Sequence, residues 1–174
     1  VNFDMFWGEY TGKRIDISDF LKDTVTMNLL GCEIKTLPPL KAMIQIILHH
    51  YKEMNSLFYL TGHHAYKKRF FEDVYLLCKR YPEEISVQKL YAISSEYEII
   101  PYVYYLFYYT KKVYNDDMLD AYLDAFRTDQ GEELLNCYGL TKEERKTWGL
   151  SFEQRLDSDV SEWVFKQMTE QDRE

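Results

Sequence analysis

An unbroken aromatic and apolar run, Tyr-Val-Tyr-Tyr-Leu-Phe-Tyr-Tyr at residues 102–109, constrains the fold of this 174-residue chain most. It follows Pro101, and proline is favoured in the first turn of a helix, where its missing N–H is not needed. A helix through this run has no polar face, so other elements must cover it on all sides. We therefore predict that it is the central helix of a mainly helical body.

Helical periodicity extends on both sides of this run. Apolar residues recur at helical spacing, with cap or breaker residues between them, over residues 40–60, 64–80, 87–97 and 117–126. Further along, Thr141 with Glu144 and Ser151 with Gln154 have the spacing of capping boxes. Residues 151–174 carry seven acids and three bases, which predicts a solvated acidic surface helix at the C-terminal end.

The N-terminal part has a different pattern. Residues 1–7 alternate with a period close to two, which predicts a strand. Residues 24–29 and 33–37 flank Leu30-Gly31-Cys32 and predict a hairpin. After Pro38-Pro39 the pattern becomes helical. We expect an α+β, mainly α chain, with short N-terminal β-strands and a hairpin over 1–37, followed by a helical bundle over 38–174.

Net charge and cysteine content limit the classes of binding partner and the cellular compartment that we expect. The net charge of −8 argues against a binder of duplex nucleic acid, which needs a basic surface. The three cysteines do not form a CxxC pair, which favours a reducing compartment. The sequence has neither a run of ~20 apolar residues nor a signal-like start, so we expect a cytoplasmic protein without membrane contact. The 17% aromatic content is interpreted as core, with a binding face as the alternative.

Candidate site residues cluster in the helices over 40–60 and 64–80. One interpretation is that His50, Lys52 and Arg69 point into a shared cleft that binds an anion such as a nucleotide phosphate. The alternative is structural, because Arg69 and Asp73 are four residues apart and can pair on one helix face. The two histidine pairs, 49–50 and 63–64, are interpreted as packed or capping residues rather than zinc ligands, since adjacent helical residues point about 100° apart.

The order of these features resembles a known family. An apolar-Asp-apolar triplet, Phe3-Asp4-Met5, precedes a hairpin that ends in Lys35-Thr36-Leu37-Pro38-Pro39. There follow His49-His50-Tyr51-Lys52-Glu53, Arg69-Phe70-x-x-Asp73-Val-Tyr-Leu-Leu, a tyrosine-rich region and Glu133-Leu-Leu-Asn-Cys-Tyr-Gly-Leu140. Over roughly residues 1–140 the chain resembles the C-terminal part of an uncharacterised bacterial nucleotidyltransferase-like family, within the polymerase-β-type nucleotidyltransferase superfamily.

The resemblance implies a function and a set of site residues. Asp4 takes the position of the third of three carboxylates that bind two Mg²⁺ ions. His49, His50, Lys52, Arg69 and Asp73 become substrate-binding residues for an NTP, whose nucleotidyl group is transferred to a small molecule, a protein or an RNA end. The Gly-Ser turn and the Asp-x-Asp pair of the superfamily are absent. One carboxylate does not hold two magnesium ions, so we expect residues 1–37 to be the remnant of a larger sheet, and this chain to be inactive alone.

Two rival functions stay open. An acidic, tyrosine-rich interaction protein of the immunity or antitoxin type would bind a basic protein partner tightly and without nucleotide. A metal-dependent helical hydrolase that uses the histidine pairs would hold a stoichiometric metal ion.

Overall fold

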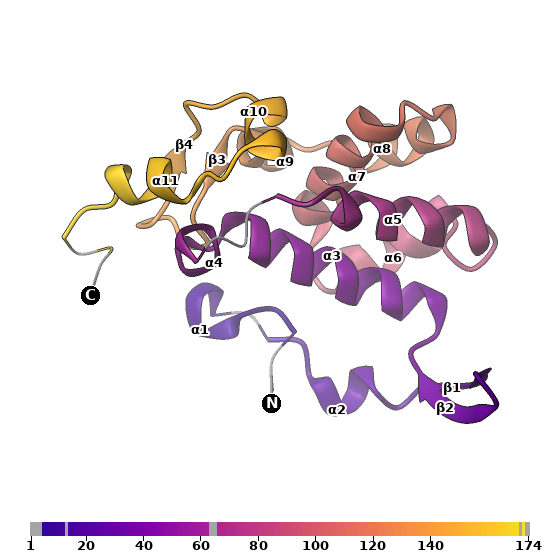
Figure 1. The fold of residues 1–174 in the computed structure, drawn as a ribbon. Helices are drawn as coiled ribbons and strands as arrows, with labels where there is room; N and C mark the ends of the chain where they lie inside the picture. The colour runs from indigo at the N-terminus through magenta and orange to yellow at the C-terminus, as the bar shows by residue number, and fades with distance from the viewer. Residues whose placement is uncertain (1–4, 13, 63–65, 171, 173–174) are drawn as a thin grey trace.

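The computed structural model describes residues 5–12, 14–62, 66–170 and 172, and its fold is α+β, mainly α (Figure 1). The helices and strands, in chain order, are α1 (Gly8–Thr11), α2 (Ile17–Phe20), β1 (Val25–Leu29), β2 (Cys32–Thr36), α3 (Pro39–Asn55), α4 (Leu57–Thr61), α5 (Lys68–Arg80), α6 (Val87–Glu96), α7 (Ile100–Tyr114), the 3-10 helix η1 (Asp117–Leu119), α8 (Asp120–Phe126), α9 (Asp129–Leu135), β3 (Cys137–Tyr138), β4 (Lys146–Thr147), α10 (Phe152–Asp157) and α11 (Ser161–Gln167).

Helix α7 is the centre of the body, which confirms the prediction made from its sequence. It contacts α3, α5, α6, α8 and α9. Its buried residues come from all sides of the helix: Pro101, Val103, Tyr104, Tyr105, Leu106, Phe107, Tyr109 and Thr110. Tyrosine is therefore mainly a core residue in this chain. The other buried tyrosines are Tyr51, Tyr66, Tyr122 and Tyr138.

The predicted hairpin is confirmed, and it projects from the helical body beside the start of α3 (Figure 1). Strands β1 and β2 pair antiparallel, with Met27 opposite Ile34. Leu30 and Gly31 form the turn with φ of 54° and 83°, as a two-residue hairpin loop requires.

The prediction of a strand over residues 1–7 is wrong for residues 5–7. Residues 1–4 lie outside the described residues. Met5 and Phe6 form a turn, and Trp7 is left-handed, with φ of 39°. Phe6 and Trp7 are both buried, stack on each other and contact the ring of Tyr102 edge-on. A strand would point these consecutive side chains to opposite faces, so burying both of them on α7 requires the turn.

The helix predicted over residues 40–60 is divided at Ser56, whose backbone is extended with ψ of 130°. At the break, the N–H of Gly139 donates a 2.8 Å hydrogen bond to the carbonyl oxygen of Asn55. Docking of the β3 region thus satisfies a carbonyl at the helix end. The next helix starts at Lys68, later than predicted.

The C-terminal segment packs against the body, contrary to the prediction of a solvated helix. It forms two short helices, α10 and α11, which bury Phe152, Arg155 and Val164. The capping box of Ser151 and Gln154 is present at the start of α10. Acidic composition predicted the exposed residues of this segment but not the few that anchor it.

Among the described helices, none is both long enough and apolar enough to cross a membrane.

Candidate functional site

One face of α3 lines a cavity of about 270 Å³. Gln45, Leu48, His49 and Lys52 recur at intervals of three or four residues, so they lie along the same side of the helix. The opposite wall is apolar and comes from the N-terminal part of the chain: Met5, Ile17, Leu21 and Leu37. An apolar cavity with a few convergent polar groups is typical of small-molecule sites, although this one is close to the lower limit of their usual volume, ~300 Å³.

The polar groups of the cavity differ in charge. Lys52 is half-buried and supplies a cation. The Nε2 atom of His49 lies 3.6 Å from Oε2 of Glu53, and the imidazole is about half exposed. Gln45 adds an amide that can both donate and accept hydrogen bonds. The cavity can therefore hold an anionic group next to Lys52 and an apolar or aromatic group against the opposite wall.

His50 lies on another side of α3, toward α5. It is buried, and its ring stacks on Phe70 with a centroid distance of 4.4 Å. Its Nε2 atom lies 3.1 Å from Oδ2 of Asp73, and its Nδ1 atom lies 3.7 Å from Oε2 of Glu53. The neighbouring His50 lowers the pKa of the Glu53 carboxyl, against the opposing effect of burial. His50 thus links α3 to α5 through Asp73, while Glu53 lies beside its other ring nitrogen on α3 itself.

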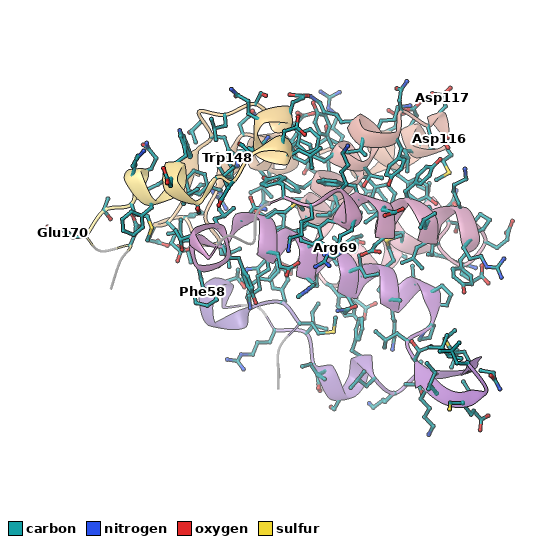
Figure 2. All side chains as sticks on the ribbon, in the orientation of Figure 1. Phe58, Arg69, Asp116, Asp117, Trp148 and Glu170 are labelled. Carbon is teal, nitrogen blue, oxygen red and sulfur yellow. The ribbon has the colours of Figure 1, made fainter. Side chains whose placement is uncertain are left out.

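Arg69 belongs to neither group. It is exposed, and its guanidinium carbon lies 5.7 Å from the centroid of the Phe70 ring. In the view of Figure 2, Arg69 lies over the helical body, away from the hairpin. Asp73 pairs with His50, so the alternative pairing of Arg69 with Asp73 is not the contact that forms.

The structure therefore separates the predicted site residues, and His50, Lys52 and Arg69, which were predicted to share one cleft, lie apart. His49 and Lys52 line the cavity, His50 and Asp73 bridge two helices, and Arg69 faces solvent. Asp4, predicted as a catalytic and magnesium-binding residue, lies outside the described residues, although its neighbour Met5 lines the cavity. Across residues 5–12, 14–62, 66–170 and 172, the structure has no group of three His, Cys, Asp or Glu side chains placed to hold a metal ion.

Sequence reasoning did not single out Arg155. This residue is only 4% exposed, and its guanidinium lies over four aromatic rings at centroid distances of 5.1–5.9 Å: Tyr66, Tyr109, Trp148 and Phe152. It donates to the hydroxyls of Tyr66 at 3.0 Å and Tyr109 at 2.8 Å. Figure 2 labels Trp148 in this C-terminal part of the molecule. In the sequence, Arg155 is one of three bases in an acidic segment, a pattern that is typical of exposed residues.

A second cavity, of about 290 Å³, lies beside this cluster. Its wall includes two cations, Lys112 and Arg155, and two carboxylates, Glu132 and Glu153. Because acids accompany the bases, this wall is a poorer match for an anion than the cavity beside Lys52. Burial raises the pKa of Tyr66 and Tyr109, and the Arg155 charge opposes that rise. The buried hydroxyls therefore stay neutral near pH 7, which suits a structural role.

Comparisons of the chain with models of protein families, with curated protein sequences and with solved structures found no significant match.

Proposed function

We propose that this chain is the substrate-binding portion of a nucleotidyltransferase-like protein, and that the cavity beside α3 binds the nucleotide. The observation that supports this most is the placement of Lys52 and His49 together on one wall, facing an apolar wall built by the N-terminal segment. Both residues belong to the motif on which the family resemblance rests.

Each wall matches one part of a nucleotide. The Lys52 ammonium is a compact charge suited to a phosphate group. Met5, Ile17 and Leu21 offer apolar surface to a planar base. Gln45 can hydrogen-bond to the base or the sugar. We infer an NTP, rather than an uncharged ligand, because Lys52 adds a cation to a cavity whose other wall is apolar.

Within the described part of the chain, no three His, Cys, Asp or Glu side chains are grouped to hold a metal ion by themselves. In the complete enzyme, nucleotidyl transfer would require carboxylates that hold the metal ions. We therefore assign nucleotide binding, and not the transfer step, to the described part of the chain. Binding of the acceptor is assigned to the complete protein.

The test is a calorimetric titration of the chain with ATP. Lys52→Ala should weaken binding about tenfold or more, because a charge-assisted hydrogen bond contributes ~1.5–3 kcal/mol. Arg69→Ala is the matched control: it removes a cation from the neighbouring helix without altering the cavity, so its affinity should stay within about twofold of wild type. Equal losses in both variants would show that the nucleotide responds to net charge alone.

A second candidate function, protein binding, is favoured by the hairpin. Every residue of β1 and all of β2 except Thr36 are exposed. Exposed apolar surface of this kind marks interaction sites. Native mass spectrometry of the protein isolated from its source, without nucleotide, tests this function: a stoichiometric second polypeptide supports it, and a monomeric chain contradicts it.

A further inference from the structure

The hairpin carries an apolar face that the described body does not cover. Met27 pairs with Ile34, and Leu29 pairs with Cys32; paired residues of an antiparallel ladder point to the same side. The exposed fractions on this face are 42% for Val25, 42% for Met27, 52% for Leu29 and 37% for Ile34. An isolated two-stranded hairpin is marginally stable in water, so it gains from pairing with further strands.

The free edge of β2 has a defined pattern of backbone groups. In a two-residue hairpin the residues that flank the turn, here Leu29 and Cys32, form a hydrogen-bonded pair, and such pairs alternate along the ladder. Cys32, Ile34 and Thr36 thus direct their N–H and C=O groups toward β1. Glu33 and Lys35 direct theirs outward, and these outward groups are available to another strand.

Charge selects the register of that pairing. If a second β2 runs antiparallel about Ile34, Glu33 of each copy lies opposite Lys35 of the other. A register centred on Glu33 or on Lys35 instead places like charges opposite each other, which is destabilising. In the register centred on Ile34, the outward N–H and C=O groups of Glu33 and Lys35 also form the hydrogen-bonded pairs.

We propose that the occupant of this edge is a second copy of the chain, bound through β2 to give a four-stranded antiparallel sheet. A two-fold axis passes between the two Ile34 residues, so the contact is isologous and closes as a dimer. The sequence of β2 is complementary to itself in charge, which a contact with an unrelated strand does not require.

Net charge also favours this edge. Residues 25–36 contain one acid, Glu33, and one base, Lys35, in a chain with a net charge of −8. Repulsion between two acidic chains is therefore smallest where their hairpins, each with zero net charge, meet. The edge of β1 would not select one pairing register by charge, because its outward residues Thr26 and Asn28 are both uncharged. The inference deepens the protein-binding function above and does not depend on the nucleotide cavity.

Disulfide trapping tests the geometry. In the register proposed, the two Ile34 residues form a non-hydrogen-bonded pair with Cα atoms about 4.5 Å apart, which a disulfide can bridge. Ile34→Cys, in a Cys32→Ser background, should give a covalent dimer on mild oxidation. Met27→Cys in the same background is the control, because β1 strands of the two copies are separated by three strand spacings, about 14 Å. Equal trapping at both positions would overturn the register.

Substitution of the charged residues of β2 tests whether the partner is a second copy of the chain. In sedimentation equilibrium, Lys35→Glu should weaken the dimer about tenfold or more, because it replaces two attractive cross-strand pairs with repulsive ones. The double variant Glu33→Lys/Lys35→Glu should restore dimerisation, since each new lysine again faces a glutamate. A wild-type chain that stays monomeric at the highest attainable concentration overturns self-pairing. If that monomer still binds a different polypeptide, protein binding survives and only the second copy is excluded.

Discussion

Arg155 donates a 2.8 Å hydrogen bond from Nη2 to the hydroxyl of Tyr109, which joins the C-terminal helix α10 to the central helix α7. The Tyr109 hydroxyl in turn donates a 2.7 Å hydrogen bond to the carbonyl oxygen of Leu135. On the other side, Arg155 donates to Tyr66, whose hydroxyl lies 2.6 Å from that of Tyr105. One buried cation therefore organises a chain of hydroxyls that crosses the core.

Removing this cation should destabilise the whole domain. Arg155→Ala deletes a long side chain packed among four rings and takes away the donors to two hydroxyls, which we expect to cost about 2–4 kcal/mol. Arg155→Lys should lie between alanine and wild type, because one ammonium does not reproduce the planar fork. Urea unfolding measures both. Exposed Arg80→Ala is the control and should stay within ~0.5 kcal/mol. A similar small change for Arg155→Ala would refute the structural role.

The last part of the chain should be held by a carboxylate that is sensitive to acid. Lys146 and the backbone and hydroxyl of Thr169 donate to Asp172, and they lower its pKa from 3.8 to about 2. A depressed pKa contributes stability above pH 3.8, and that contribution is lost as the pH falls toward 2. Urea unfolding of wild type and Asp172→Asn should show a difference at pH 5 that shrinks near pH 2. A difference independent of pH contradicts this assignment.

The adjacent histidines should respond oppositely to substitution. His50→Ala removes a buried ring stacked on Phe70 and paired with Asp73, so it should lower the free energy of unfolding by about 2–3 kcal/mol. ATP affinity should change little in the protein that remains folded. His49→Ala should leave stability within ~0.5 kcal/mol and weaken ATP binding, because His49 lines the cavity. Identical effects of the two substitutions would place the nucleotide elsewhere.

The thiols should differ in reactivity. Cys32 is exposed on β2, whereas burial raises the pKa of the Cys78 thiol to about 12. Only the thiolate reacts with iodoacetamide, so the native chain should label at Cys32 long before Cys78. Peptide mass spectrometry at increasing times measures the order in which the two thiols are labelled. In urea, where the chain is unfolded, the difference in their labelling rates should disappear. Fast labelling of Cys78 in the native chain would contradict its burial.

The fold was largely predictable from local patterns, and the exceptions have tertiary causes. The turn at Leu30 and Gly31 and the all-round apolar surface of α7 are encoded by neighbouring residues. The break at Ser56 depends on docking of Gly139, which is distant in the sequence. The turn at Phe6 depends on an aromatic site on α7. Neither contact can be predicted from the spacing of neighbouring residues.

The candidate site was predictable in part. The motif indicated α3, but the prediction from sequence grouped His50 with Lys52. In the structure His49 lines the cavity with Lys52, and His50 lies toward α5. Which side faces a cavity depends on where the N-terminal segment folds back, and this is a property of the tertiary structure. The burial of Arg155 was not predictable, since an arginine in an acidic segment is exposed more often than buried.

Nucleotide binding in the cavity beside α3 is the central claim, and the methyl group of Met5 reports on it directly. Methionine methyl groups labelled with ¹³C can be followed by NMR while ATP is added, with the Met5 signal assigned from Met5→Leu. We expect a saturable shift of Met5, which lines the cavity, and none of Met118, which lies in η1. A Met5 signal that does not move at millimolar ATP would contradict the claim.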